Sequence, residues 1–137
     1  MGSSFTPRQF HFIGSNKIRK GTDWSRDYQF LDSAGLAVDM SQYNADAGGL
    51  VRVSFKSGDL ATTYFSSAAG TAGVQWDAND PSILNIFVTD TASAALSGTI
   101  PNSAVYQVEG VSGTSSLTDR LLEGRVEMDF EVVTGST

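Results

Sequence analysis

One stretch near the end of the chain constrains the fold more than any other, because apolar and charged residues alternate there without a break. Residues 125–132 read RVEMDFEV, so Val126, Met128, Phe130 and Val132 share one face. A period of two is typical of a strand with one buried and one solvated face. We therefore expect a strand over residues 120–133, kinked at Glu123-Gly124, that pairs as a hairpin with a second strand over 104–109.

The rest of the chain repeats this pattern in short runs separated by turn residues. Further strands are expected at residues 9–13, 24–31, 36–40, 50–56, 62–66, 74–76 and 82–89, with a turn at 32–35. One short helix is expected at 90–96. This order predicts an all-β protein, an antiparallel β-sandwich of about eight or nine short strands with at most one short helix. The expected core residues are Val51, Val53, Phe55, Ile86, Val88, Tyr106, Val126, Met128 and Phe130.

Length and charge limit the possible classes. A chain of 137 residues fits one domain, and we divide it into residues 1–13, an N-terminal arm with the first short strand, and 14–137, a single β-sandwich domain. The net charge of −6 disfavours nucleic-acid binding. No run approaches the ~18 apolar residues of a membrane span. The start has no signal-peptide core, so we expect synthesis in a cytoplasm and no membrane insertion.

Catalytic and metal-binding residues are scarce. His11 is the single histidine, the chain has no cysteine, and no G-x-S-x-G motif is present, so the sequence predicts no catalytic residue and no cofactor. Asp77, Asn79 and Asp80 are oxygen ligands of the type that calcium prefers, but the EF-hand spacing fails. Ordinary turn chemistry explains the same residues, and we predict no metal site.

Two charged groups have both a functional and a structural interpretation. Lys17, Arg19 and Lys20 form a basic loop that would suit an anion, although a solvated loop is the favoured interpretation. Glu127, Asp129 and Glu131 resemble the carboxylates of a glycosidase only in type. Their alternation favours an open, solvated strand face.

The large aromatic residues leave a sugar-binding alternative open. A stacking platform could draw on Trp24, Tyr28, Tyr43, Tyr64, Trp76 and Tyr106. Core packing is the favoured interpretation for most of them, because several lie on the apolar face of an expected strand.

Two segments carry a resemblance to a known family. The first joins GTDW at 21–24 to FLDSAGLAVDMSQY at 30–43 and to Val51-Arg52. The second joins YQVE at 106–109 to RLLEGRV at 120–126. In order and spacing the two resemble the opening and the ending of small tailed-phage and prophage proteins, which are similar to the N-terminal domain of siphophage upper baseplate proteins. Met40-Ser41-Gln42 and Gln107 depart from the usual residues of that pattern.

This resemblance implies a non-enzymatic structural protein of a tailed-bacteriophage virion. The implied role is a tail, baseplate or fibre-attachment component that contacts other virion structural proteins. A capsid decoration or head protein, and a carbohydrate-binding adhesion module, are the alternatives. The motif residues specify turns and strands, and none matches an active-site residue.

Apolar strand edges need a cover, and this suggests a homo-oligomer, either a ring or a trimer. Residues 82–88 lie in the most β-prone run, whose near-continuous apolarity suggests burial on both sides or at an interface. An apolar run of this kind is an aggregation risk if it forms an uncovered edge strand, and residues 9–13 follow a polar arm. We expect at least one of them to pack on a neighbouring subunit. The predicted assembly interface consists of Phe10, Phe12, Ile83, Leu84 and Phe87.

Overall fold

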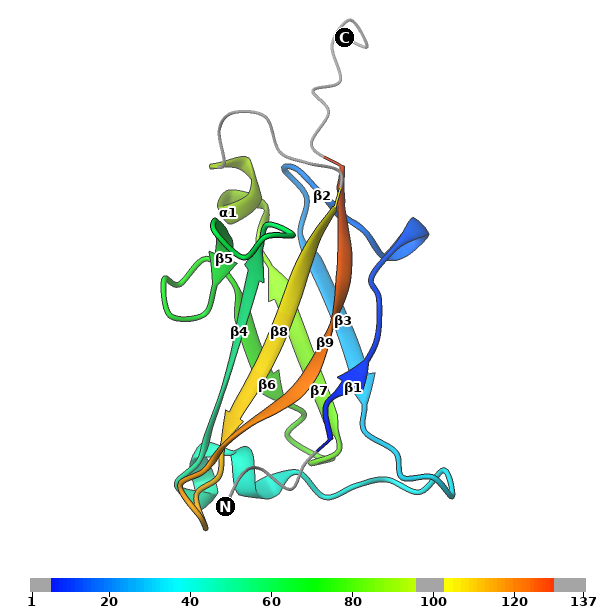
Figure 1. Cartoon of the computed structure of the whole chain (residues 1–137), viewed down its shortest axis with the longest axis vertical. Helices are drawn as coiled ribbons and strands as arrows, with labels where there is room; N and C mark the ends of the chain where they lie inside the picture. The colour runs from blue at the N-terminus through cyan, green and yellow to red at the C-terminus, as the bar shows by residue number, and fades with distance from the viewer. Residues whose placement is uncertain (1–5, 96–102, 130–137) are drawn as a thin grey trace, which may run out of the picture.

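Two β-sheets stack face to face in this protein (Figure 1). The structure, a computed structural model, describes residues 6–95 and 103–129. Nine strands are assigned there: β1 Arg8–Gln9, β2 Ile18–Arg19, β3 Trp24–Gln29, β4 Leu50–Lys56, β5 Thr63–Ser66, β6 Gly73–Trp76, β7 Ile83–Val88, β8 Ser103–Val111 and β9 Thr118–Asp129. The helical pieces are α1 Asp90–Ala94 and the 3-10 turns η1 Gly14–Asn16, η2 Ser41–Tyr43 and η3 Ala45–Ala47. The predicted all-β sandwich with one short helix is confirmed.

The larger sheet is built around β9, as the alternating stretch predicts. Its order is β1-β9-β8-β4-β5, and β2 also pairs with β9. Strand β9 is continuous through Gly124, and its irregularity lies instead at Leu121, where the register with β8 shifts. This bulge lets the consecutive Leu121 and Leu122 both be fully buried.

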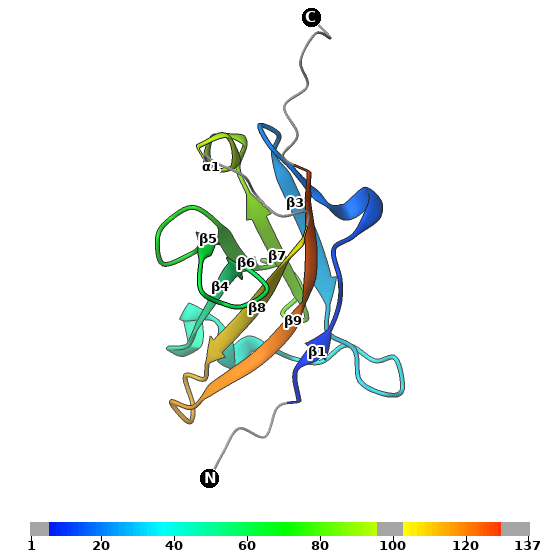
Figure 2. The same cartoon turned by 45° about the horizontal axis from the view of Figure 1, so that its top comes forward.

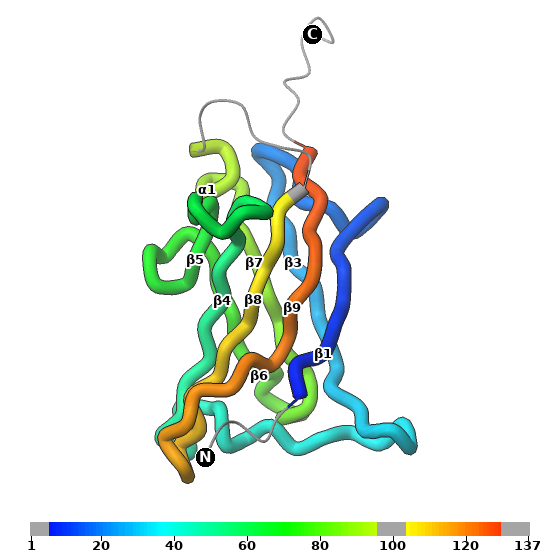
Figure 3. The backbone as a smooth tube through the Cα atoms, viewed as in Figure 1, coloured from blue at the N-terminus to red at the C-terminus, as the bar shows by residue number. Residues whose placement is uncertain are grey.

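The N-terminal segment is part of this sheet and not a separate arm from residue 8 onward. It runs parallel to β9, with Arg8 opposite Leu122, Phe12 opposite Val126 and Ile18 opposite Met128. Figures 2 and 3 show the segment following β9 from one end of the body toward the other. A Cβ on Gly124 would lie 1.9 Å from the Phe10 carbonyl oxygen. Gly124 therefore permits a close backbone approach, and the predicted kink is wrong.

The smaller sheet has the order β3-β7-β6, with antiparallel pairing throughout. Strand β7 is its central strand, so of the alternatives for residues 82–88 the uncovered edge strand is wrong. Its strong apolarity has another cause: Leu84, Ile86 and Val88 face the core while both edges of the strand are paired.

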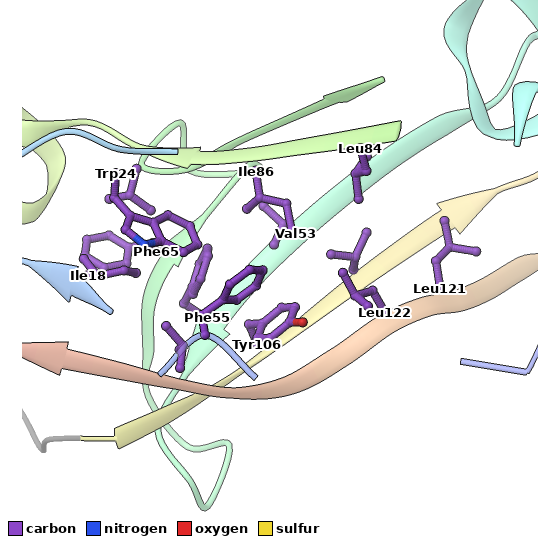
Figure 4. Close-up of a cluster of buried hydrophobic side chains, with 14 of the residues drawn as sticks. Ile18, Trp24, Val53, Phe55, Phe65, Leu84, Ile86, Tyr106, Leu121 and Leu122 are labelled. Atoms are coloured by element: carbon purple, nitrogen blue, oxygen red, sulfur yellow. The ribbon is translucent and has the colours of Figure 1, made fainter. Parts of the chain in front are cut away.

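Apolar side chains from both sheets fill the space between them (Figure 4). Of the predicted core residues, Val53, Phe55, Ile86, Val88, Tyr106, Val126 and Met128 are buried, and Val51 packs against them. Phe130 lies outside the described residues. Trp24, Phe12 and Phe55 make edge-to-face ring contacts between 5.1 and 5.9 Å, which favours a fixed arrangement of the core.

Residues 31–37 form a narrow hairpin in place of the predicted strand at 36–40. The amide of Gly35 donates to the Asp32 carbonyl at 2.9 Å, and the amide of Val38 donates to Phe30 at 2.9 Å. Only the single bridge between Leu31 and Ala37 continues the ladder. After it the chain turns along the end of the smaller sheet, where the Met40 amide donates to the Pro81 carbonyl.

Candidate functional site

The outer face of the larger sheet carries polar side chains in three cross-strand rows. They follow from the strand register, because the buried Val53, Phe55 and Tyr106 alternate with outward residues. The first row is Lys56, Val105 and Arg125, the second is Ser54, Gln107, Glu123 and Gln9, and the third is Arg52, Glu109 and Arg120.

The second and third rows together are balanced in charge, whereas the first row carries two cations and no carboxylate. Arg52 Nε donates to Glu109 Oε1 at 3.0 Å, and Arg120 lies 3.4 Å from Glu123 Oε1. Within the described part of the chain, neither Lys56 nor Arg125 has an acidic partner within 4.0 Å. Four cations thus share this face with two carboxylates, although the whole chain carries −6.

A hollow of about 380 Å³ opens on this face between β9, β8 and the loop that joins β4 to β5. His11, Arg120 and Arg125 line it together with the amide side chains of Gln9 and Gln107. Leu60 contributes an apolar wall from the loop. Glu123 also lines the hollow, where it lies 3.4 Å from Arg120, and Val105 adds a second apolar contact. The lining is therefore mixed in charge, with Arg125 as the cation that has no acidic partner among the described residues.

Leu60 has an unusual backbone conformation. Its φ is +64°, in the left-handed region that only glycine adopts without strain, and its side chain is 50% exposed. The loop is fixed by Asp59, which accepts from the Ser57 hydroxyl at 2.6 Å and the Ala61 amide at 3.0 Å. The Ser57 bond, followed by the amide bond, lowers the pKa of Asp59.

His11 has a structural contact in this site. Its Nδ1 accepts the backbone N–H of Arg125 at 2.8 Å, which fastens the N-terminal segment to β9. Its ring therefore acts as a backbone acceptor on an exposed edge. Among the described residues, no carboxylate or nucleophile forms a hydrogen bond to this ring.

The carboxylates of β9 do not lie on the open face that the sequence predicts. Glu127 Oε1 accepts the Gly14 amide at 2.6 Å, and Asp129 lies 3.6 Å from both Lys17 and Arg19. The basic loop thus contacts the end of β9, and both groups help to hold the N-terminal segment. Glu131 lies outside the described residues.

Asp77, Asn79 and Asp80 are engaged in their own turn. Asp77 accepts the Asn79 amide at 3.0 Å, and Asp80 accepts the Ser82 hydroxyl at 2.6 Å and the Ser82 amide at 3.0 Å. The hydroxyl bond is the main reason why the pKa of Asp80 is lowered. Among the described residues, no three His, Asp or Glu side chains gather to hold a metal ion.

Three of the large aromatic residues use their polar N–H or O–H group for a hydrogen bond to a backbone carbonyl inside the fold. Trp24 donates to the Asn16 carbonyl at 2.7 Å, Trp76 to the Tyr43 carbonyl at 3.1 Å and Tyr106 to the Phe10 carbonyl at 2.6 Å. Trp24, Tyr43 and Tyr106 are buried, and Tyr28, Tyr64 and Trp76 are partly buried against the core. Core packing therefore accounts for all six aromatic residues considered as a sugar platform.

A buried tyrosine–carboxylate pair closes the end of the sandwich near the β8–β9 loop. The Tyr43 hydroxyl donates to Asp119 Oδ2, while Asp119 Oδ1 is buried without a hydrogen-bond partner. Burial, followed by the bond to Asp119, raises the pKa of Tyr43. Asp119 faces inward because the bulge at Leu121 shifts the alternation of β9 by one residue, so neither its burial nor its partner was predictable from spacing.

The residues of the predicted assembly interface are not brought together. Phe12 and Leu84 lie in the core, at 1% and 0% exposure, so an external partner does not reach them in this fold. Phe10 remains 39% exposed on the N-terminal segment, whereas Ile83 and Phe87 are partly buried on β7. Contact of these three residues with another subunit stays a prediction.

Comparisons with known proteins give no identification. No protein-family model matches the chain, and no curated protein sequence matches it.

Within residues 6–95 and 103–129, no helix is long and apolar enough to cross a membrane.

Proposed function

We propose that this protein is a non-enzymatic structural protein of a tailed-bacteriophage virion, with a tail, baseplate or fibre-attachment role. The observation that carries the proposal is that the two segments that resemble phage proteins form one contiguous unit. Val51-Arg52 lies on β4, and residues 106–109 and 120–126 lie on β8 and β9, which are consecutive neighbours in the larger sheet.

Specific contacts join these segments across large sequence distances. Arg52 pairs with Glu109, and Tyr43, the last residue of the run 30–43 in the first segment, donates to Asp119 beside the second. Tyr43 also packs on Gly110, where a Cβ would lie 2.5 Å from its ring. A pattern whose members contact one another is expected of a fold shared within a family, and this supports the resemblance.

The use of the polar groups supports a role without catalysis. His11, Glu127, Asp80 and Asp59 each accept hydrogen bonds that fasten a turn or the N-terminal segment. Such groups stabilise a rigid surface, and a rigid β-sandwich suits a component whose work is to contact other virion proteins.

Fractionation of purified phage particles tests the proposal. Particles produced by cells that carry this gene are separated into heads and tails and probed with an antibody against the purified protein. We expect the protein in the tail fraction at a constant copy number per particle. Recovery only in heads would favour the decoration role, and recovery only outside particles would contradict a virion role.

A further inference from the structure

The N-terminal segment is attached to β9 through a ladder in which one hydrogen-bond acceptor is a side chain (Figure 3). The other bonds join backbone groups. The amides of Phe10 and Phe12 donate to β9 carbonyls at 3.0 and 2.9 Å, and the Glu127 amide donates to the Phe12 carbonyl at 2.9 Å. Between them, the Arg125 amide donates to His11 Nδ1 at 2.8 Å. His11 therefore takes a place in the ladder that a backbone carbonyl normally has.

The Phe10 carbonyl, which would continue the backbone ladder, has a different partner. It accepts the Tyr106 hydroxyl at 2.6 Å, and His11 supplies the acceptor for the Arg125 amide. The charge of a backbone carbonyl does not change across the physiological pH range, whereas a histidine side chain ordinarily gains a proton between about pH 8 and pH 5. The bond to His11 is therefore a step of the ladder that responds to pH.

The ring of His11 accepts a hydrogen bond only while it is neutral. A neutral imidazole has one N–H and one bare nitrogen, whereas both nitrogens of the imidazolium carry a proton. Because Nδ1 is the acceptor here, the proton of the neutral ring lies on Nε2. A second proton would lie on Nδ1 and point at the Arg125 N–H, whose nitrogen is 2.8 Å away. Protonation of the ring and this hydrogen bond therefore exclude each other.

No ion pair offsets a proton on His11. Among the described residues, no carboxylate oxygen lies within 4.0 Å of its ring nitrogens. Of the outward carboxylates of β9, Glu123 contacts Arg120 at 3.4 Å and a side-chain amide at 2.6 Å, and Glu127 accepts a backbone amide at 2.6 Å. The titratable and charged groups that line the hollow with His11 are Arg120, Glu123, Arg125 and Tyr106. An imidazolium would thus join two arginines there, while both carboxylates already have partners.

We propose that His11 makes the attachment of the N-terminal segment to β9 sensitive to pH. The neutral ring holds residues 8–13 on the strand, and protonation below about pH 6 breaks the bond to Arg125 and raises the fraction of molecules in which the segment is open. The pairing of β8 with β4 and with β9 involves no histidine and is unaffected. Opening uncovers Phe12, which is 1% exposed in the attached state, and leaves the edge of β9 without its partner.

Amide hydrogen exchange of the full chain at about pH 5.5 and about pH 7.5 tests this proposal. His11 is the single histidine, so it is the side chain that ordinarily changes charge in this interval. After correction for the intrinsic exchange rates, the protection of the Phe10, Phe12 and Arg125 amides should be at least about fivefold lower at the acidic pH. The amides that join β4 to β8 should change by less than about twofold.

Two variants separate the titration of His11 from its packing. His11→Asn keeps a neutral carbonyl acceptor that gains no proton, and His11→Ala removes the acceptor. In both variants the protection of the Phe10 and Phe12 amides should no longer depend on pH in this interval, and His11→Ala should show the lower protection. Equal protection of the wild type at the two pH values, or a fall with acid that persists in either variant, would overturn the proposal.

Nitrogen-15 chemical shifts of the His11 ring give a second readout that does not depend on opening. At about pH 7.5 they should show the proton on Nε2 and a bare Nδ1, as the bond to Arg125 requires. A proton on Nδ1 at this pH would contradict the proposed attachment. The proposal is independent of the virion role, since absence of the protein from phage particles would leave the response of the purified chain to pH unchanged.

Discussion

Gly124→Ala tests the attachment of the N-terminal segment to β9. The new Cβ would lie 1.9 Å from the carbonyl oxygen of Phe10 and 2.7 Å from its carbonyl carbon. Both atoms belong to the backbone, so no side-chain rotation removes the overlap. The segment must move away from β9, while the strand itself can keep its ladder to β8.

The cost follows from the contacts that this movement breaks. The amides of Phe10 and Phe12 donate to β9 carbonyls at 3.0 and 2.9 Å, and the Tyr106 hydroxyl donates to Phe10 at 2.6 Å. Three hydrogen bonds at about 0.5–1.5 kcal/mol each amount to about 1.5–4.5 kcal/mol. Partial exposure of Phe12 adds to this loss, whereas alanine in the unfolded chain offsets about 0.4–1 kcal/mol. We expect a net loss of about 2–5 kcal/mol in the free energy of unfolding.

Urea unfolding followed by circular dichroism measures this loss. With an m-value of about 1–3 kcal/mol/M, the midpoint should fall by roughly 1–3 M. Gly58→Ala is the matched control, because its Cβ meets nothing within 4 Å and its φ is not positive. If Gly124→Ala unfolds at the same urea concentration as Gly58→Ala, the parallel packing of the N-terminal segment on β9 is refuted.

Three further predictions concern the core and the buried tyrosines. Phe12→Ala should cost about 3–5 kcal/mol in urea unfolding and Phe10→Ala about 1 kcal/mol or less, and equal losses would contradict the burial difference. Asp119→Ala should cost about 1–3 kcal/mol, because the Tyr43 hydroxyl loses its buried acceptor, and a neutral result would show that this bond is not formed. Burial raises the pKa of Tyr43 and Tyr106, so the unfolded chain releases their protons first. Stability should be full below about pH 10 and fall as the pH rises further, with the tyrosinate absorbance of Tyr43 and Tyr106 appearing only together with unfolding.

Periodicity was a reliable guide wherever a strand is buried on one face. Strand β4 matches its predicted bounds, and the inward residues Val53 and Phe55 are buried as expected. Strand β9 runs from Thr118 to Asp129, and the alternation holds from Leu122 onward, with Val126 and Met128 facing the core. Before Leu122 the bulge at Leu121 shifts it by one residue. These patterns depend on local sequence alone, because alternate residues of a strand point to opposite sides.

Pairing between distant segments was not predictable in the same way. The short run at residues 9–13 indicates a strand, but nothing in it specifies a parallel partner 114 residues later. A glycine at position 124 is consistent with a close approach of another backbone and equally with a kink in the strand. The sequence does not distinguish these two interpretations. The apolarity of residues 82–88 is likewise compatible with two arrangements. One is an edge strand covered by another subunit, and the other is a central strand with both edges paired.

The candidate site was missed because its residues are ordinary when considered singly. Lys56, Arg125 and Leu60 come from different strands and a loop, and only the register of β4, β8 and β9 brings them together. The absence of lysine and arginine from residues 27–51 was visible in the sequence, but in the structure Arg8 donates to the Leu31 carbonyl within this range. Its meaning depends on where the cations lie in space.

Electron cryomicroscopy of intact virions from cells that carry this gene tests the central claim most directly. The account predicts density for this two-sheet domain at the tail or baseplate, repeated by symmetry. A complete particle map without this domain at the tail or baseplate would contradict the proposed tail, baseplate or fibre-attachment function.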